Sequence, residues 1–280
     1  LQLLGSQNDM ATIRLETSNS TVVAEYEPLK RKSDSYQSEA VLEKEFIRML
    51  TEQGYDYLEI HEQDALVKNL RKQLELLNDY KFTESEWERF FNNNIANNND
   101  GIVEKTRKIQ EDYIQVLKKD DGTSKNIYLL DKKNIHNNRL QVINQYVENN
   151  GNYDNRYDVT ILVNGIPLVH VELKRRGIAL KEAFNQINRY QRDSFWAGSG
   201  LYEYIQIFVI SNGTNTKYYS NTTRESHIKE QSQTRNKSKK TSNSFEFTSY
   251  WADANNKVIN DLVDFTRTFL SKHTILNVLT

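Results

Sequence analysis

The sequence of 280 residues has no cysteine, which excludes disulfide bonds, thiolate zinc sites and cysteine nucleophiles together. It also lacks any apolar run close to the roughly 18 residues that a membrane-spanning helix needs. Proline and glycine are scarce, at 2 and 10 residues, which favours long regular elements. The N-terminal residues do not combine a basic start with an apolar stretch, so secretion is not indicated. These absences fit a cytoplasmic protein without membrane contact.

A net basic charge, which is common in DNA-binding proteins, is also missing. The 37 Lys and Arg residues nearly balance the 38 Asp and Glu residues, so the formal net charge is -1. A nucleic-acid surface would therefore have to be a local basic patch on a neutral protein. Hydrophobic residues make up 37% of the chain, which is typical of a globular protein rather than a disordered one.

The first half of the chain is predicted to be mainly helical. Residues 1–34 lack periodicity and are interpreted as an N-terminal arm on a domain at 35–280. The pattern predicts a helix at about 36–52, a strand at 55–60, a helix carrying Leu66, Leu70, Leu74 and Leu77, a helix that begins at the capping box Thr83–Glu86, and a loop at 92–99.

From about residue 113 onward, the chain is predicted to contain most of the strands. The expected strands cover 113–117, 126–130, 140–147, 157–163, 167–173, 204–210 and 217–219, and the expected helices cover 179–195 and 256–271. Residues 224–244 are rich in Ser, Thr, Gln and Lys and are interpreted as a mobile basic loop. This order predicts an α/β fold with one mixed sheet.

Asp158 begins one expected strand, and Glu172 and Lys174 end the next. Two carboxylates on neighbouring strands can supply part of a magnesium site, since Mg²⁺ prefers a few carboxylates and retained waters. Side chains two positions apart in a strand point the same way, so Glu172 and Lys174 share a side. Such a centre suits phosphodiester hydrolysis, in which a metal offsets charge and Lys174 orients the attacking water.

Strand geometry sets a condition on the connection between these strands. A plain two-residue turn at Asn164-Gly165 would pair Asp158 with Val171 and place the two acids on opposite faces. The site therefore requires an odd connection or a β-bulge. We expect a three-residue loop at 164–166, which would set Asp158 opposite Glu172.

The alternative is that these residues are ordinary solvated acids at strand ends, with Lys174 as an ion-pair partner. The acid-and-lysine spacing is loose enough to allow it. The flanking runs 161–163 and 168–171 are almost continuously apolar, which implies strands covered on both faces. An acid and a lysine at the end of such a strand need partners or a metal.

Four segments resemble the N-terminal nuclease region of the R subunit of type I restriction enzymes. They are Asn155–Gly165, Glu172–Gly177, Ala183–Ile187 with Tyr190, and Phe208–Thr214, and the resemblance extends from about Ser35 to the C-terminus. It implies a PD-(D/E)xK restriction-endonuclease-like mixed sheet flanked by helices. It further implies Mg²⁺ ligation by Asp158 and Glu172, with Lys174 as the catalytic lysine. Tyr157 stands where this motif usually has a proline.

The resemblance also suggests supporting residues. Gln186 and Tyr190 match a motif implicated in DNA contact and in coupling to the motor, although a core tyrosine beside a surface glutamine would look the same. Glu43 best matches a helix-borne acid that the fold places near the metal. Arg175, Arg176 and Arg189 belong to a basic cluster around the catalytic strand, which could bind phosphates or simply be a charged helix face. A lone strand histidine, His170, is interpreted as structural.

The leading hypothesis is the endonuclease domain of a type I restriction motor subunit, a site-specific deoxyribonuclease by class. It would cut double-stranded DNA without sequence specificity of its own, beside partner methyltransferase and specificity subunits. No phosphate loop ending in Gly-Lys-Ser/Thr occurs, so the ATP-dependent motor domains of the family are expected to be missing. Two alternatives are a module that is inert in isolation and a free-standing nuclease of the same fold.

Overall fold

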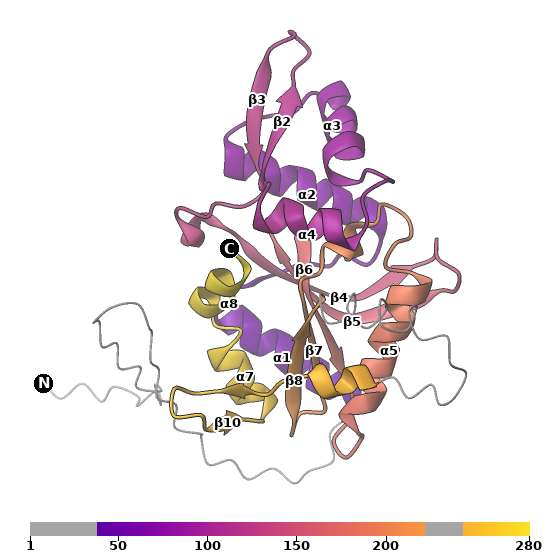
Figure 1. The fold of residues 1–280 in the computed structure, drawn as a ribbon, viewed down its shortest axis with the longest axis vertical. Coiled ribbons are helices and arrows are strands. Elements are labelled where there is room, and N and C mark those ends of the chain that lie inside the picture. Colours follow the sequence, from indigo (N-terminus) through magenta and orange to yellow (C-terminus); the bar gives the residue numbers. More distant parts are fainter. Residues whose placement is uncertain (1–37, 222–242) are drawn as a thin grey trace, which may run out of the picture.

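The computed structural model describes residues 38–221 and 243–280 and is built around one six-stranded mixed sheet (Figure 1). The strand order is β1-β4-β5-β6-β7-β8, with parallel pairing of β1 with β4 and of β6 with β7. The strands are β1 (Asp56–Tyr57), β4 (Leu140–Glu148), β5 (Asn155–Val163), β6 (Ile166–Leu173), β7 (Ile207–Ser211) and β8 (Thr216–Ser220). The predicted mixed-sheet α/β fold is confirmed.

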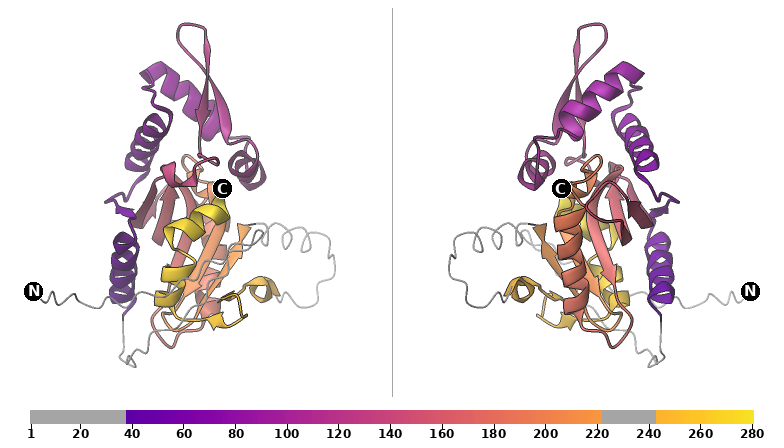
Figure 2. Two further views of the ribbon diagram at one scale, coloured as in Figure 1. Left: turned by 90° about the vertical axis from the view of Figure 1, so that its left-hand side faces the viewer. Right: turned by 90° about the vertical axis from the view of Figure 1, so that its right-hand side faces the viewer.

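Helices cover both faces of this sheet. Helix α5 (Leu180–Asp193) lies on one side, and α1 (Glu39–Glu52), α7 (Leu262–Thr268) and α8 (Lys272–Leu279) lie on the other (Figures 1 and 2). The Ser38 hydroxyl caps α1, and that helix buries Leu42, Phe46 and Leu50 at helical spacing. Strand β6 is buried along its whole length because helices press on it from both faces.

A helical extension with its own hairpin sits at one end of the sheet (Figure 1). It contains α2 (Gln63–Asn78), α3 (Glu84–Phe90), the π-helical turn η1 (Phe91–Ile95), α4 (Ile102–Gln110), β2 (Ile114–Lys118) and β3 (Ser124–Tyr128). The predicted capping box is confirmed, because Thr83 and Glu86 exchange side-chain and backbone hydrogen bonds at the start of α3.

Three sequence predictions were wrong in detail. The expected loop at 92–99 begins as the turn η1, because Ile95 is fully buried and anchors it; α4 was not foreseen. The expected strand at 204–210 starts only at Ile207, after the 3₁₀ turn η3 (Leu201–Tyr204). The expected helix at 256–271 is divided, as the short strand β10 (Val258–Ile259) pairs with β9 (Trp251–Ala252) and precedes α7.

The remaining elements are the 3₁₀ turns η2 (Ile135–Asn137) and η4 (Asn243–Phe247). Aspartate and serine caps begin the two C-terminal helices, at Asp261 for α7 and at Ser271 for α8. The arm predicted at 1–34 lies outside the described residues, and so does the predicted basic loop as far as residue 242.

The hairpin of β5 and β6 contains the bulge that the site requires. Asn164 and Gly165 form a two-residue turn with positive φ at both positions, as a type I′ turn needs. The register then shifts, because Leu162 pairs with Pro167 and Ile161 pairs with Val169. The three-residue loop at 164–166 was therefore wrong, but the odd register is confirmed: the extra residue is Leu168, which follows two paired positions, Ile166 and Pro167, after the turn.

Changing Gly165 to alanine is expected to lower the free energy of unfolding by about 2–4 kcal/mol. Its φ is +82°, and an added Cβ would lie 2.6 Å from the Leu70 Cα of helix α2. Gly122 is the matched control, with the same φ of +82° and no atom within 4 Å of an added Cβ. Its alanine variant should lose only about 1 kcal/mol. Urea unfolding of both variants checks this; equal losses would contradict a tight turn–helix contact.

Candidate active site

The shifted register brings Asp158 and Glu172 together across β5 and β6. Val159 pairs with Val171, so the next residues along the two strands are the two acids. An Asp158 carboxylate oxygen also accepts a hydrogen bond from the Leu173 backbone N–H at 2.9 Å. Glu172 is fully buried, whereas Asp158 is only partly buried. The acid pair therefore reaches solvent through Asp158.

Burial of these two carboxyl groups disfavours their charged forms. Burial, followed by repulsion from Glu172, raises the pKa of Asp158 well above its ordinary value. Burial also raises the pKa of Glu172, although Lys174 and a hydrogen bond with Asp158 act in the opposite direction. Without a cation, the pair is thus predisposed to hold a proton between its oxygens.

Lys174 and His170 both contact Glu172. The Lys174 Nζ lies 3.3 Å from Glu172 Oε1, which confirms that residues 172 and 174 share a side of the strand. The His170 Nε2 lies 3.3 Å from Glu172 Oε2. Burial lowers the pKa of His170 to about 4, so its imidazole is neutral near pH 7. Residues 170 and 172 share a side of strand β6, as the period of two predicts, and this contact leaves the structural interpretation of His170 in place.

Helix α1 presents two acids toward this region. The Glu39 carboxylate accepts a hydrogen bond from the Arg175 backbone N–H at 3.3 Å, and its charge acts on Glu172. The Glu43 carboxylate instead accepts hydrogen bonds from Asn144 Nδ2 at 2.6 Å and Gln145 Nε2 at 2.5 Å. The catalytic role of Glu43 stays a prediction, and the structure places its oxygens on strand β4. Nothing in the sequence pattern singled out Asn144 or Gln145.

Gln186 and Tyr190 lie on α5 and touch each other, as their spacing predicts. The Gln186 amide donates a hydrogen bond to the Tyr190 hydroxyl, and this hydroxyl donates to the Arg156 carbonyl at 2.9 Å. Burial raises the pKa of the Tyr190 phenol, so the hydroxyl keeps the proton that it donates. The pair thus ties α5 to strand β5 two residues before Asp158, and its part in DNA contact stays a prediction.

The predicted basic residues differ in how free they are. Arg175 and Arg189 have exposed side chains, and the Arg189 guanidinium lies over the Tyr190 ring at 5.4 Å. Arg176 is partly buried and donates to the Thr214 hydroxyl at 3.1 Å, so it has fewer donors left for a phosphate. Arg175 and Arg189 therefore keep more of their donors exposed than Arg176 does, and a role of the three in DNA contact stays a prediction.

The donor set at the acid pair suits a hard divalent cation. Two adjoining carboxyl groups supply oxygen ligands, and the Lys174 ammonium, 3.3 Å from Glu172 Oε1, offsets part of their charge. Within residues 38–221 and 243–280, no group of three or more His, Cys, Asp or Glu side chains is arranged around a common metal position. Two carboxylates with retained waters are the usual set for Mg²⁺.

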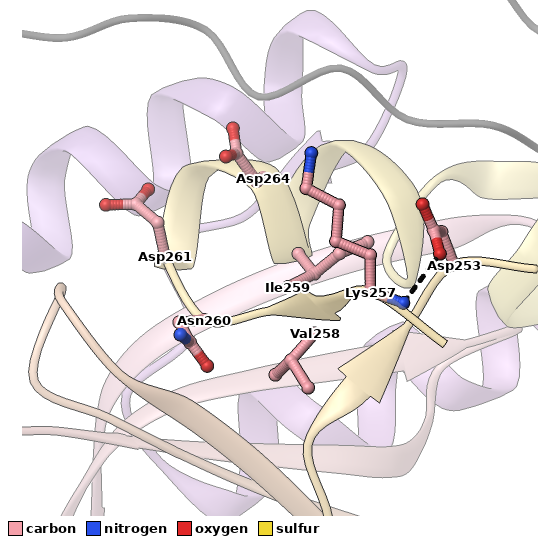
Figure 3. A pocket seen from close by; sticks show the side chains of 7 residues that line it. All are labelled: Asp253, Lys257, Val258, Ile259, Asn260, Asp261 and Asp264. Carbon is pink, nitrogen blue, oxygen red and sulfur yellow. Dashed lines mark hydrogen bonds between the residues drawn. The ribbon is translucent and has the colours of Figure 1, made fainter. Parts of the chain in front are cut away.

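A cleft of about 210 Å³ lies elsewhere, between β10 and the start of α7 (Figure 3). Asp253, Lys257, Asp261 and Asp264 line it, and none of the predicted site residues does. The Asp253 carboxylate accepts hydrogen bonds from two backbone N–H groups of its own turn, and the Asp261 carboxylate caps α7. These acids hold the local backbone, so this cleft is not the candidate active site.

The fold and the acid pair define a restriction-endonuclease-like α/β protein. A family model described as the N terminus of the type I restriction enzyme R protein matches residues 36–227, more than half of the chain. The chain therefore belongs to the type I restriction enzyme R protein N-terminal family, as the resemblance predicted.

Named relatives agree with this family. The type I restriction enzyme EcoprrI endonuclease subunit of Escherichia coli is 49% identical over 265 residues, covering 94% of this chain and 80% of that protein. The SsaAORF53P subunit of Staphylococcus saprophyticus is 38% identical over 240 residues, and the SauMSSORF170P subunit of Staphylococcus aureus is 36% identical over 244 residues. Each of these two alignments includes 84% of this chain but only 23% of the staphylococcal protein.

None of the helices described in residues 38–221 and 243–280 is both long enough and apolar enough to cross a membrane.

Proposed function

We propose that this chain is a Mg²⁺-dependent endonuclease domain that hydrolyses phosphodiester bonds of double-stranded DNA. The observation that carries the proposal is the adjoining pair of the partly buried Asp158 and the fully buried Glu172, with Lys174 beside it. Keeping two adjoining carboxyl groups largely away from water is costly, and a protein keeps such an arrangement where it serves a metal or a reaction.

The three side chains divide the work by their positions. Asp158 and Glu172 would hold the ion, which supplies charge compensation for the phosphate and a more acidic bound water. The Lys174 ammonium lies beside Glu172 and is less buried than it, with a side chain 12% exposed. It can therefore reach the phosphate side of the pair, orient the attacking water and offset negative charge that builds up on the phosphoryl oxygens.

The wider assembly is part of the proposal. The relatives are named as endonuclease subunits of type I restriction enzymes. By analogy, sequence recognition would belong to a specificity subunit that acts with a methyltransferase subunit, and DNA translocation would belong to ATP-binding motor domains. The exposed Arg175 and Arg189 would then contact phosphates, which carry no sequence information.

The decisive experiment is nicking of supercoiled plasmid by this chain. With Mg²⁺ we expect relaxed and then linear DNA, with breaks spread over many positions, and no product in EDTA. A parallel titration measures the melting temperature against Mg²⁺ concentration, since an ion that binds only the folded state raises it. Absence of both cleavage and a Mg²⁺-dependent rise would contradict the proposal.

A second candidate is a module that binds Mg²⁺ but is inert in isolation. The complete burial of Glu172 favours it, because a catalytic carboxylate needs access that the remaining subunits could open. A Mg²⁺-dependent rise in melting temperature without plasmid nicking is the result that this candidate predicts.

A further inference from the structure

Strand β4 is irregular at the residue that faces Asp158. Asn144 pairs with Val159 and Tyr146 pairs with Tyr157, but Gln145 and Asp158 between them form no ladder pair. Gln145 has φ of +51°, in the left-handed region that residues with a Cβ seldom adopt. The register is the same on both sides, so Gln145 is a local kink rather than an inserted residue.

Side chains from three neighbouring segments hold this kink. The Glu43 carboxylate of α1 accepts a hydrogen bond from Gln145 and a second one from Asn144. The Tyr57 hydroxyl donates to the Asn144 side-chain oxygen at 2.9 Å, and the His61 ring nitrogen Nδ1 lies 3.0 Å from the Asn144 carbonyl oxygen. A strained conformation that is braced this fully is typical of a functional site.

The kink lies where the acid pair opens to solvent. Tyr157 and Val159 are fully buried, and so is Glu172, whereas Asp158 is partly exposed. Strand β1 pairs with β4 only at Gln141 and Val142, and the segment after β1 follows β4 as far as Val147, whose N–H donates to the His61 carbonyl at 2.9 Å. Gln145 lies between these held positions and is the residue of β4 opposite Asp158.

We infer that Gln145 is a positioning residue whose left-handed backbone, held by Glu43, keeps strand β4 bent away from Asp158. The bend leaves room for a divalent cation and a phosphodiester group at the acid pair. Glu43 then acts through Gln145 rather than on the substrate. This inference rests on the proposed function, because it concerns access to the same metal site.

Two substitutions at Gln145 separate its backbone from its side chain. Glycine adopts the left-handed region freely, whereas β-branched valine favours a strand. We expect Gln145→Val to raise the apparent dissociation constant for Mg²⁺ about tenfold or more, the usual effect of altering residues that support metal ligands. We expect Gln145→Gly to stay within about threefold of the wild type, because glycine keeps the bend unaided. The constant comes from melting-temperature titrations, each referred to that variant's own metal-free value.

The brace gives a second, independent measurement. Glu43→Ala should weaken Mg²⁺ binding about tenfold, as loss of a supporting residue typically does. Adding Gln145→Gly to Glu43→Ala should restore most of the affinity, since a glycine at 145 no longer needs the carboxylate. A merely structural role for Glu43 predicts no such rescue.

Asn256 is the matched control, because it also has a positive φ, of 60°, but lies in the turn between β9 and β10. Asn256→Val should lower the melting temperature without changing Mg²⁺ affinity. Equal Mg²⁺ affinity in Gln145→Val and Gln145→Gly would overturn the inference, and so would the absence of rescue in the double variant. If the wild type itself bound no Mg²⁺, or bound it as well after Asp158→Asn, the proposed function would fail first.

Discussion

Lys174→Met is expected to lower Mg²⁺-dependent cleavage on the order of 10²–10³-fold, the usual cost of losing one group that stabilises transition-state charge. Mg²⁺ affinity should not fall, because the Lys174 ammonium lies 3.3 Å from Glu172 Oε1 and competes with a cation for that oxygen. Methionine keeps the length and apolar stem of lysine. The measurement pairs initial nicking rates with the melting-temperature titration.

Asp158→Asn is expected to lower cleavage for a different reason, the loss of Mg²⁺ binding. It removes the more exposed of the two carboxylates, so cleavage and Mg²⁺ binding should fall together, cleavage by about 10³-fold or more. Asp154→Asn is the matched control, since Asp154 is exposed and lies one residue before strand β5. Lys174→Met with lost Mg²⁺ affinity, or Asp158→Asn with normal cleavage, would refute this division of roles.

The acid pair could be predicted from the sequence because strand geometry follows a strict period of two. Once Asp158 and Glu172 were placed on neighbouring strands, only an odd connection or a β-bulge could bring them together. The position of the extra residue could not be predicted. Asn164-Gly165 is a strong two-residue turn signal, and it formed that turn. Leu168 is the extra residue, and its side chain is fully buried. A bulge at this position keeps the apolar side chains in the core, which depends on packing between distant segments.

The surroundings of the pair depend on contacts between distant segments. Glu43 meets Gln145 across 102 residues, and no local pattern marks a glutamine that will take a left-handed conformation in a strand. Likewise, the polar run Asn92–Asn94 predicts a loop. The next residue, Ile95, is buried in the core, and residues 91–95 form a helical turn. Short-range patterns predicted the acid pair, and the side chains around it depend on long-range packing.

Without metal, the wild type is expected to lose stability as the pH rises, and Asp158→Asn is expected to lose less because only Glu172 still titrates. Burial raises the pKa of Asp158 to about 8 from 3.8, and that of Glu172 to about 7 from 4.5. Between these limits the folded state binds more protons than the unfolded chain, so the free energy of unfolding falls with increasing pH. The stability that the protonated carboxyl pair contributes is fully present below about pH 4 and is lost once the pH exceeds about 8.

In EDTA, the free energy of unfolding of Asp158→Asn should therefore exceed that of the wild type increasingly from pH 5 to pH 8. The difference should reach on the order of 2–4 kcal/mol, a figure reduced for the partial exposure of Asp158. Saturating Mg²⁺ should reverse the order, because only the wild type keeps both carboxylates that would bind the ion. Urea unfolding across this pH range, with and without Mg²⁺, measures both effects, and Asp154→Asn should follow the wild type throughout. Two results would contradict this account. One is a difference in unfolding free energy between the two proteins that stays constant with pH, and the other is an order of stability that Mg²⁺ leaves unchanged.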